Sequence, residues 1–260
     1  NEAAEILYRI SADIHMHGSD IKEGKIELIA DCDGVLKIRR DALLAVNSLG
    51  EMMIASRHGD FPVKKGDKIA GTRIIPLIIE KSKMDKAEKV AGTKPIFSIL
   101  PYRSKKVGII TTGSEVQKGL IKDTFTPVLK EKLDEFSCQI LGQTLPGDER
   151  SQITSDILSF IDQDADMVIC SGGMSVDPDD RTPGAIKDTG AEIVTYGAPV
   201  LPGAMLLLSY YQNNDKIIPI LGLPGCVMYA RRTVFDLILP RIMADDRICA
   251  DEIASHGEGG

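Results

Sequence analysis

Beyond about residue 103, short runs typical of strands alternate with stretches that have helical spacing. The runs lie at 107–111, 139–145, 167–170, 192–196 and 217–221. The helical stretches lie at 124–136, 151–161, 182–188 and 227–242. Both faces are apolar in the runs at 107–111, 167–170 and 217–221, which is typical of a parallel sheet covered by helices on both sides. The pattern predicts an α/β fold with three layers, α/β/α, around a mostly parallel sheet.

The first part of the chain has a different pattern, in which short apolar runs alternate with turn residues. Strands are expected at 26–30, 35–38, 52–56 and 69–79. Residues 41–49 have helical spacing and end at Gly50, and residues 81–90 form a polar helix or linker. Because the chain begins at Asn1 and not at methionine, this part could be truncated at its N-terminus. We expect a β-rich accessory region, an α/β domain and a tail over 1–103, 104–250 and 251–260.

Composition narrows the classes of function. The net charge is −7, so the chain lacks the basic surface of a nucleic-acid-binding protein. The five cysteines are far apart and form no CxxC pair, which favours a reducing cytoplasm over a disulfide framework or a zinc cluster. No apolar run approaches the roughly 20 residues that span a bilayer, so no membrane partner is expected. His15 and His17 would share a strand face, but without a third ligand we interpret them as surface residues.

Glycine-rich turns follow three of the predicted strands, at the edge of the sheet where open α/β folds bind ligands. They read Thr112-Gly113-Ser114-Glu115, Ser171-Gly172-Gly173-Met174-Ser175 and Gly222-Leu223-Pro224-Gly225. Glycine lets backbone N–H groups approach an anion closely, and a helix N-terminus adds unpaired donors. One such turn would only tighten a connection between strand and helix. Three of them at one edge predict a phosphate cradle, by which we mean these three turns together.

Acidic residues fall in the same strand-end loops: Glu115, Asp148, Asp177, Asp179 and Asp180. Carboxylates that face a phosphate site indicate Mg²⁺, which prefers oxygen ligands and substrate phosphates. Helix capping is the alternative interpretation. Asp180 precedes Thr182-Pro183, and Asp148 precedes the helix at 151–161. For Asp148 the sequence leaves both interpretations open.

These motifs together resemble a known family. TTGSE, a loop aspartate before an Ile-rich helix, SGGMSVDPDD-x-TPGAI and GLPG are similar to the molybdopterin-binding fold of molybdenum-cofactor biosynthesis enzymes. That family includes molybdopterin molybdotransferase, molybdopterin adenylyltransferase and the domains of gephyrin. The resemblance covers about residues 105–247, and VKKGDKIAGTRIIP adds a likeness to the accessory region of the molybdotransferases.

The resemblance implies a pterin dithiolene ligand with a terminal phosphate, molybdopterin, in its free or adenylylated form, together with Mg²⁺. It implies catalytic and metal-binding roles for Glu115, Asp148 and Asp180. It implies that the ligand is bound by residues of the phosphate cradle: Thr112, Gly113, Ser114, Gly172, Gly173, Ser175, Gly222, Pro224 and Gly225. It also implies a homo-oligomer that works with other cofactor-biosynthesis proteins.

Two departures from the molybdotransferase pattern bear on the activity. That family carries lysines for molybdate in a KPGKP-like segment, whereas residues 198–205 read APVLPGAM. GLPG continues as Cys226-Val227-Met228 in place of Asn-Pro-Val, and Asp180-x-Thr182-Pro183 is closer to the adenylyltransferase pattern. We expect a molybdotransferase-like transferase that inserts the metal into adenylylated molybdopterin. An adenylyltransferase-like enzyme and a non-catalytic molybdopterin-binding or carrier module are the alternatives.

Overall fold

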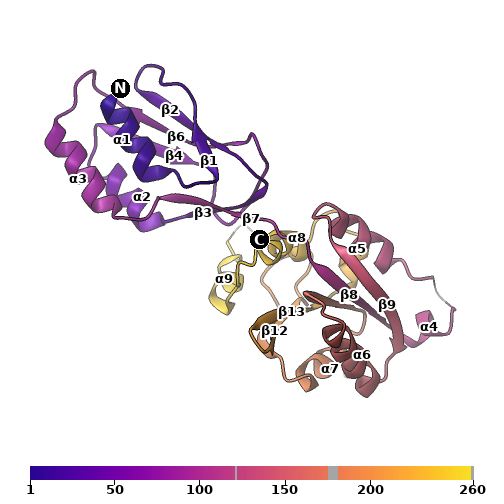
Figure 1. Cartoon of the computed structure of the whole chain (residues 1–260). Coiled ribbons are helices and arrows are strands. Elements are labelled where there is room, and N and C mark those ends of the chain that lie inside the picture. The colour runs from indigo at the N-terminus through magenta and orange to yellow at the C-terminus, as the bar shows by residue number, and fades with distance from the viewer. Residues whose placement is uncertain (121, 175–180, 259–260) are drawn as a thin grey trace. The chain divides into compact units, whose positions relative to one another are not determined.

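The computed structural model describes residues 1–120, 122–174 and 181–258. The chain separates into two compact units, whose elements are labelled in Figure 1. The first unit comprises Asn1–Tyr102 and Ala244–Asp246, and the second comprises Arg103–Met243 and Arg247–Gly260.

The first unit combines two antiparallel sheets with three helices. The larger sheet has the strand order β1-β2-β6-β4, and the smaller one has the order β5-β3-β7. The strands are β1 (Met16–Gly18), β2 (Lys25–Ala30), β3 (Gly34–Ile38), β4 (Met52–Ser56), β5 (Pro62–Val63), β6 (Lys68–Ile74) and β7 (Phe97–Pro101). The helices are α1 (Glu2–Ser11), α2 (Arg40–Asn47) and α3 (Lys81–Ala91). Leu7 of α1, Leu28 of β2 and Phe97 of β7 belong to one buried core.

Two expectations for this unit are corrected by the structure. The strand expected at 69–79 ends at Ile74, and Pro76, which has no backbone N–H to donate, follows shortly after. Leu77 and Ile78 of that stretch are exposed. Helix α1 and strand β7 had no predicted counterpart, although α1 buries Leu7 and Ile10 at helical spacing.

The second unit is built around a six-stranded sheet with the order β11-β12-β13-β10-β8-β9. The strands are β8 (Lys106–Thr112), β9 (Gln139–Gly147), β10 (Met167–Ser171), β11 (Glu192–Tyr196), β12 (Leu207–Asn213) and β13 (Lys216–Leu223). Strands β13, β10, β8 and β9 pair in parallel, and β12 runs antiparallel to both of its neighbours. This mostly parallel arrangement confirms the predicted fold class.

Helices cover both faces of this sheet. The helices of the second unit are α4 (Ser114–Gln117), α5 (Phe125–Asp134), α6 (Arg150–Asp162), α7 (Thr182–Asp188), α8 (Val234–Met243) and α9 (Ala250–Ser255). Figure 1 shows α6 and α7 on one face and α5 and α8 on the other. The neighbouring residues Ile109 and Ile110 of β8 are both fully buried, as expected of a strand whose two faces are covered. No helix in the described ranges is long and apolar enough to cross a membrane.

Three features of the second unit differ from the sequence expectations. The single helix expected at 227–242 is divided into a 3₁₀ helix η1 (Gly225–Met228) and α8. The Thr233 N–H donates to the Asp236 carboxylate at 2.7 Å, and a new helix begins there. Strand β12 was not predicted. The stretch expected to be a tail, 251–260, contains most of α9.

Candidate functional site

The carboxyl ends of four strands meet at one edge of the six-stranded sheet in the second unit. Ser171, the last residue of β10, pairs with Thr111 of β8 on one side and with Leu223 of β13 on the other. Thr112 of β8 pairs with Gly147 of β9. The loops that follow these strands therefore share the edge at which open α/β sheets bind ligands.

The loop after β8 is joined to the loop after β9 by a carboxylate. The backbone N–H of Ser114, the first residue of α4, donates to an Asp148 carboxylate oxygen at 2.9 Å. The N–H of Gly113 donates to the Gly147 carbonyl at 3.3 Å. Helix α6 has Glu149 at its N-cap and no side-chain capping bond. Asp148 thus binds the start of α4 and does not cap the helix that follows it.

The loop after β10 needs glycine at two successive positions. Gly172 and Gly173 have φ values of 86° and 56°. A Cβ atom on Gly172 would lie 2.6 Å from the Thr112 carbonyl oxygen, and one on Gly173 would lie 2.8 Å from the Thr182 hydroxyl. The Thr182 hydroxyl donates to the Gly172 carbonyl at 2.9 Å. The loop is therefore held against the end of β8 and the start of α7.

The loop after β13 contains a glycine that the fold itself does not require. A Cβ atom on Gly225 would meet no heavy atom within 4 Å, and its φ is not in the left-handed region. By contrast, a Cβ atom on Gly222, inside β13, would lie 2.6 Å from the Met174 sulfur. Gly225 is exposed at the first position of η1. Open space beside an exposed glycine at a strand end leaves room for a ligand to approach the backbone.

The structure describes only some of the predicted carboxylates. Glu115, in α4, and Asp148, in the loop after β9, are both exposed, and the Ser114–Asp148 hydrogen bond joins α4 to that loop. Ser175, Asp177, Asp179 and Asp180 lie outside the described residues. Among the residues that are described, no group of three or more His, Cys, Asp or Glu side chains is placed to hold a metal ion.

Two further residues at this edge were given no role in the site by the sequence analysis. Thr182 is fully buried and its hydroxyl also lies 3.3 Å from that of Thr112, so it links two loops. Asp123 accepts the N–H of Phe125 at 2.8 Å and thereby holds the start of α5. Burial raises the pKa of Asp123, but hydrogen bonds from Thr126 and Gln143 outweigh it and hold that pKa below its ordinary value. An aspartate shortly before a helical stretch, as in Asp123-Thr124-Phe125, is a capping signal that could have identified it.

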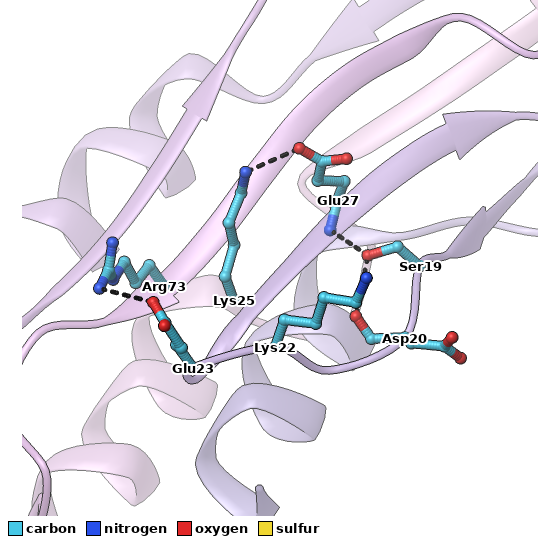
Figure 2. Close-up of a pocket in the computed structure, with 7 residues that line it drawn as sticks. All are labelled: Ser19, Asp20, Lys22, Glu23, Lys25, Glu27 and Arg73. Atoms are coloured by element: carbon cyan, nitrogen blue, oxygen red, sulfur yellow. Dashed lines mark hydrogen bonds and ion pairs between the residues drawn. The ribbon is translucent and has the colours of Figure 1, made fainter.

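A second concave region lies in the first unit, and its charges largely compensate one another. Figure 2 shows this pocket, whose volume is about 450 Å³. Glu27 accepts hydrogen bonds from Lys25 and Lys68, both at 2.7 Å, which lower the pKa of its carboxyl to about 2. Arg73 lies 3.9 Å from Glu23. We assign no site to this pocket because Lys25 and Arg73, two of its three cationic side chains, already face carboxylates.

The geometry defines a class of protein: an α/β protein with glycine-rich loops at one sheet edge that suit an anionic ligand. The family described as "Probable molybdopterin binding domain" matches residues 108–244, and the chain belongs to that family. This match confirms the resemblance read from the sequence motifs.

The chain is similar to several curated proteins. It is 27% identical to the molybdopterin molybdenumtransferase of Haemophilus influenzae, over 87% of this chain and 54% of the relative. It is 25% identical to the enzyme of the same name from Synechococcus elongatus, over 71% and 44%. A CinA-like protein of Mycobacterium marinum is 34% identical over 30% of this chain and 19% of that protein. The chain spans about half the length of the two transferases it matches.

The chain is also similar to solved structures. The tungsten cofactor synthesizing protein MoaB from Pyrococcus furiosus matches 56% of this chain and 99% of its own, with 16% identity and a TM-score of 0.46.

Proposed function

We propose that the second unit binds molybdopterin with its terminal phosphate in the phosphate cradle. The observation that carries this proposal is the convergence of the glycine loops after β8, β10 and β13 on one sheet edge. Gly172 and Gly173 are required by the fold, whereas Gly225 is not. A glycine kept where a side chain would fit is explained if the ligand approaches the backbone there.

We propose a molybdotransferase-like activity on adenylylated molybdopterin, as the names of the two transferase relatives suggest. Mg²⁺ usually binds one or two carboxylates together with substrate phosphates. Glu115 and Asp148 fit that requirement, because Asp148 uses one oxygen on the Ser114 N–H and keeps the other available. In this proposal the metal supplies positive charge at the phosphates, and Asp180 completes the set of carboxylates.

The loop that would hold molybdate favours a second candidate function, a non-catalytic carrier of molybdopterin. Residues 198–205 contain no lysine. The loop is closed on itself, since the Ala198 N–H donates to the Ala204 carbonyl at 2.8 Å. Its Pro202 carbonyl accepts the N–H of Val234 at 3.1 Å. A loop without a cationic side chain would bind an oxyanion weakly. This suits a protein that binds the cofactor and does not insert the metal. The same loop is compatible with an adenylyltransferase-like enzyme.

Calorimetric titration with molybdopterin and with its adenylylated form, each with and without Mg²⁺, tests these proposals. We expect the parent chain to bind. Gly173→Val should abolish this binding, because the added side chain would overlap the Thr182 hydroxyl. Gly190→Val is the matched control, since Gly190 also has a positive φ but open space around its Cβ. Glu115→Ala should weaken Mg²⁺-dependent binding and leave metal-free binding unchanged. Absence of binding to both forms would refute the pterin proposal.

Turnover separates the candidate activities. Release of AMP from the adenylylated form on addition of molybdate would support the molybdotransferase. Formation of the adenylylated form from molybdopterin and ATP would support the adenylyltransferase. Tight binding with neither reaction would support the carrier.

We further propose a cytoplasmic homo-oligomer that exchanges its ligand with other cofactor-biosynthesis proteins. The five cysteines are free thiols, which suits a reducing compartment. Light scattering coupled to size-exclusion chromatography would measure the mass in solution, and a monomer at all concentrations would contradict the oligomer.

A further inference from the structure

A short exposed segment, residues 229–232, connects η1 to α8 and is held at both ends. At its start, the N–H groups of Tyr229 and Ala230 donate to the Cys226 carbonyl at 3.1 and 2.9 Å. At its end, both the N–H and the hydroxyl of Thr233 donate to Asp236, at 2.7 and 3.3 Å. The backbone of the segment is therefore fixed, while its side chains extend from it.

Those side chains are unusual for a surface loop of an acidic chain. Tyr229 is 84% exposed. Arg231 and Arg232 are exposed, and neither forms an ion pair with any residue that the structure describes. The nearest acidic side chain in sequence, Asp236, is already engaged by Lys132 and Thr233. The segment thus carries an exposed aromatic ring and two exposed guanidinium groups that have no carboxylate partner in the described ranges.

The segment starts at the same sheet edge as the phosphate cradle and leads from there along α5. It follows η1 immediately, and η1 starts at Gly225, two residues beyond Leu223 at the carboxyl end of β13. The Thr124 hydroxyl contacts the Met228 sulfur at 3.1 Å, so the start of α5 borders η1. Lys132 of α5 donates to the Arg231 carbonyl at 3.4 Å and keeps the segment beside that helix. A ligand that extends from the GLPG turn along α5 would therefore pass this segment.

Two properties of the segment indicate the ligand chemistry. An exposed tyrosine ring stacks on planar heterocycles, and alanine substitution of such rings costs roughly 5- to 150-fold in affinity, or about 1–3 kcal/mol. The planar guanidinium fork of arginine binds phosphate oxygens in pairs. We infer that Tyr229, Arg231 and Arg232 form a second subsite for a planar heterocycle that carries a phosphate.

This inference rests on the proposed function, because the second subsite extends the cradle at which the ligand's terminal phosphate would bind. A pterin ring and an adenine ring share the chemistry that the subsite recognises. Tyr229 would cover the face of the ring, and the two arginines would neutralise the phosphate next to it.

Equilibrium titration of the full chain with four probes tests the subsite. The probes are AMP, adenosine, a 6-hydroxymethylpterin monophosphate and inorganic phosphate. Tyr229→Ala should weaken AMP or the pterin phosphate about tenfold and leave inorganic phosphate unchanged, whereas Tyr229→Phe, which keeps the ring, should stay within about twofold of the parent. The double variant R231Q/R232Q should weaken AMP more than adenosine. R231K/R232K should recover only part of that loss, because lysine keeps the charge and lacks the fork.

The arms of the experiment identify the source of the heterocycle and separate the two proposals. A Tyr229→Ala effect on AMP alone assigns the ring to adenine, and an effect on the pterin phosphate alone assigns it to the pterin. If Gly173→Val abolishes molybdopterin binding while all Tyr229 and arginine variants bind every probe like the parent, the subsite is overturned and the proposed function stands. If the parent chain binds none of the probes and no form of molybdopterin, both are overturned.

Discussion

The close approach of Gly172 to the end of β8 leads to a quantitative prediction about stability. In Gly172→Ala the new Cβ atom would lie 2.6 Å from the Thr112 carbonyl oxygen and 2.8 Å from its hydroxyl. Because this carbonyl belongs to a paired strand, it cannot shift without disturbing the pairing of β8. Gly190→Ala is the matched control, because Gly190 has φ 87°, close to the 86° of Gly172, and a Cβ atom there would meet no atom within 4 Å.

The two variants differ by one physical contribution. Both place alanine at positive φ, which costs roughly 1–2 kcal/mol. Only Gly172→Ala adds steric overlap, and overpacking in a well-packed region costs typically about 1–3 kcal/mol. We therefore expect Gly172→Ala to lower the free energy of unfolding of the second unit by about 2–5 kcal/mol and Gly190→Ala by about 1–2 kcal/mol.

Native-state hydrogen exchange is the suitable assay, because a chain of two units need not unfold in a single transition. The most protected amides of β10 report the free energy of opening the second unit alone. Equal losses in the two variants, or a smaller loss in Gly172→Ala, would show that the contact with Thr112 does not constrain the loop. The fold would then not require glycine at position 172 of the phosphate cradle.

Three further predictions concern single residues. Thr182→Val should cost about 1–3 kcal/mol in the unfolding free energy of the second unit, measured in the same exchange experiment, because the Gly172 carbonyl loses its hydroxyl donor; a neutral effect would contradict the assigned bond. Gly225→Ala should leave stability within about 0.5 kcal/mol of the parent while weakening calorimetric binding of molybdopterin, and unchanged affinity would refute a ligand approach at that glycine. Hydrogen bonds from two lysines lower the pKa of Asp164 from 3.8 to about 2, so its stabilising effect is present above pH 3.8 and is lost as the pH falls toward 2. Asp164→Asn should therefore flatten acid unfolding in that window, and an unchanged acid profile would contradict this assignment.

The alternation of strands and helices in the second unit could be predicted because its signals are local. Strands β8, β10 and β13 are apolar on both faces, and α7 and β11 begin and end at the residues expected from the pattern. Strand β12 was missed although its residues are mostly apolar. The turn after it, where Asn214 has a φ of 53°, was a hairpin signal that the pattern of parallel strands obscured.

The break between η1 and α8 shows where local periodicity misleads. Apolar residues continue at helical spacing through 227–242, so the pattern alone predicts one helix. The stretch is divided because the Asp236 carboxylate accepts the Thr233 N–H, and a new helix begins there. Tyr229, in the stretch between η1 and α8, is 84% exposed.

By itself the sequence determined which loops end the strands and which of them carry glycines and carboxylates, because strand and turn signals depend on neighbours a few residues away. Only the tertiary structure decided the partners of those groups. Asp148 could have capped its own helix, but the register of β8 with β9 places it at the Ser114 N–H, 34 residues away. Thr182 reaches Thr112 across 70 residues because β10 lies beside β8. Contacts of this kind follow from strand order and register, which periodicity along the chain does not encode.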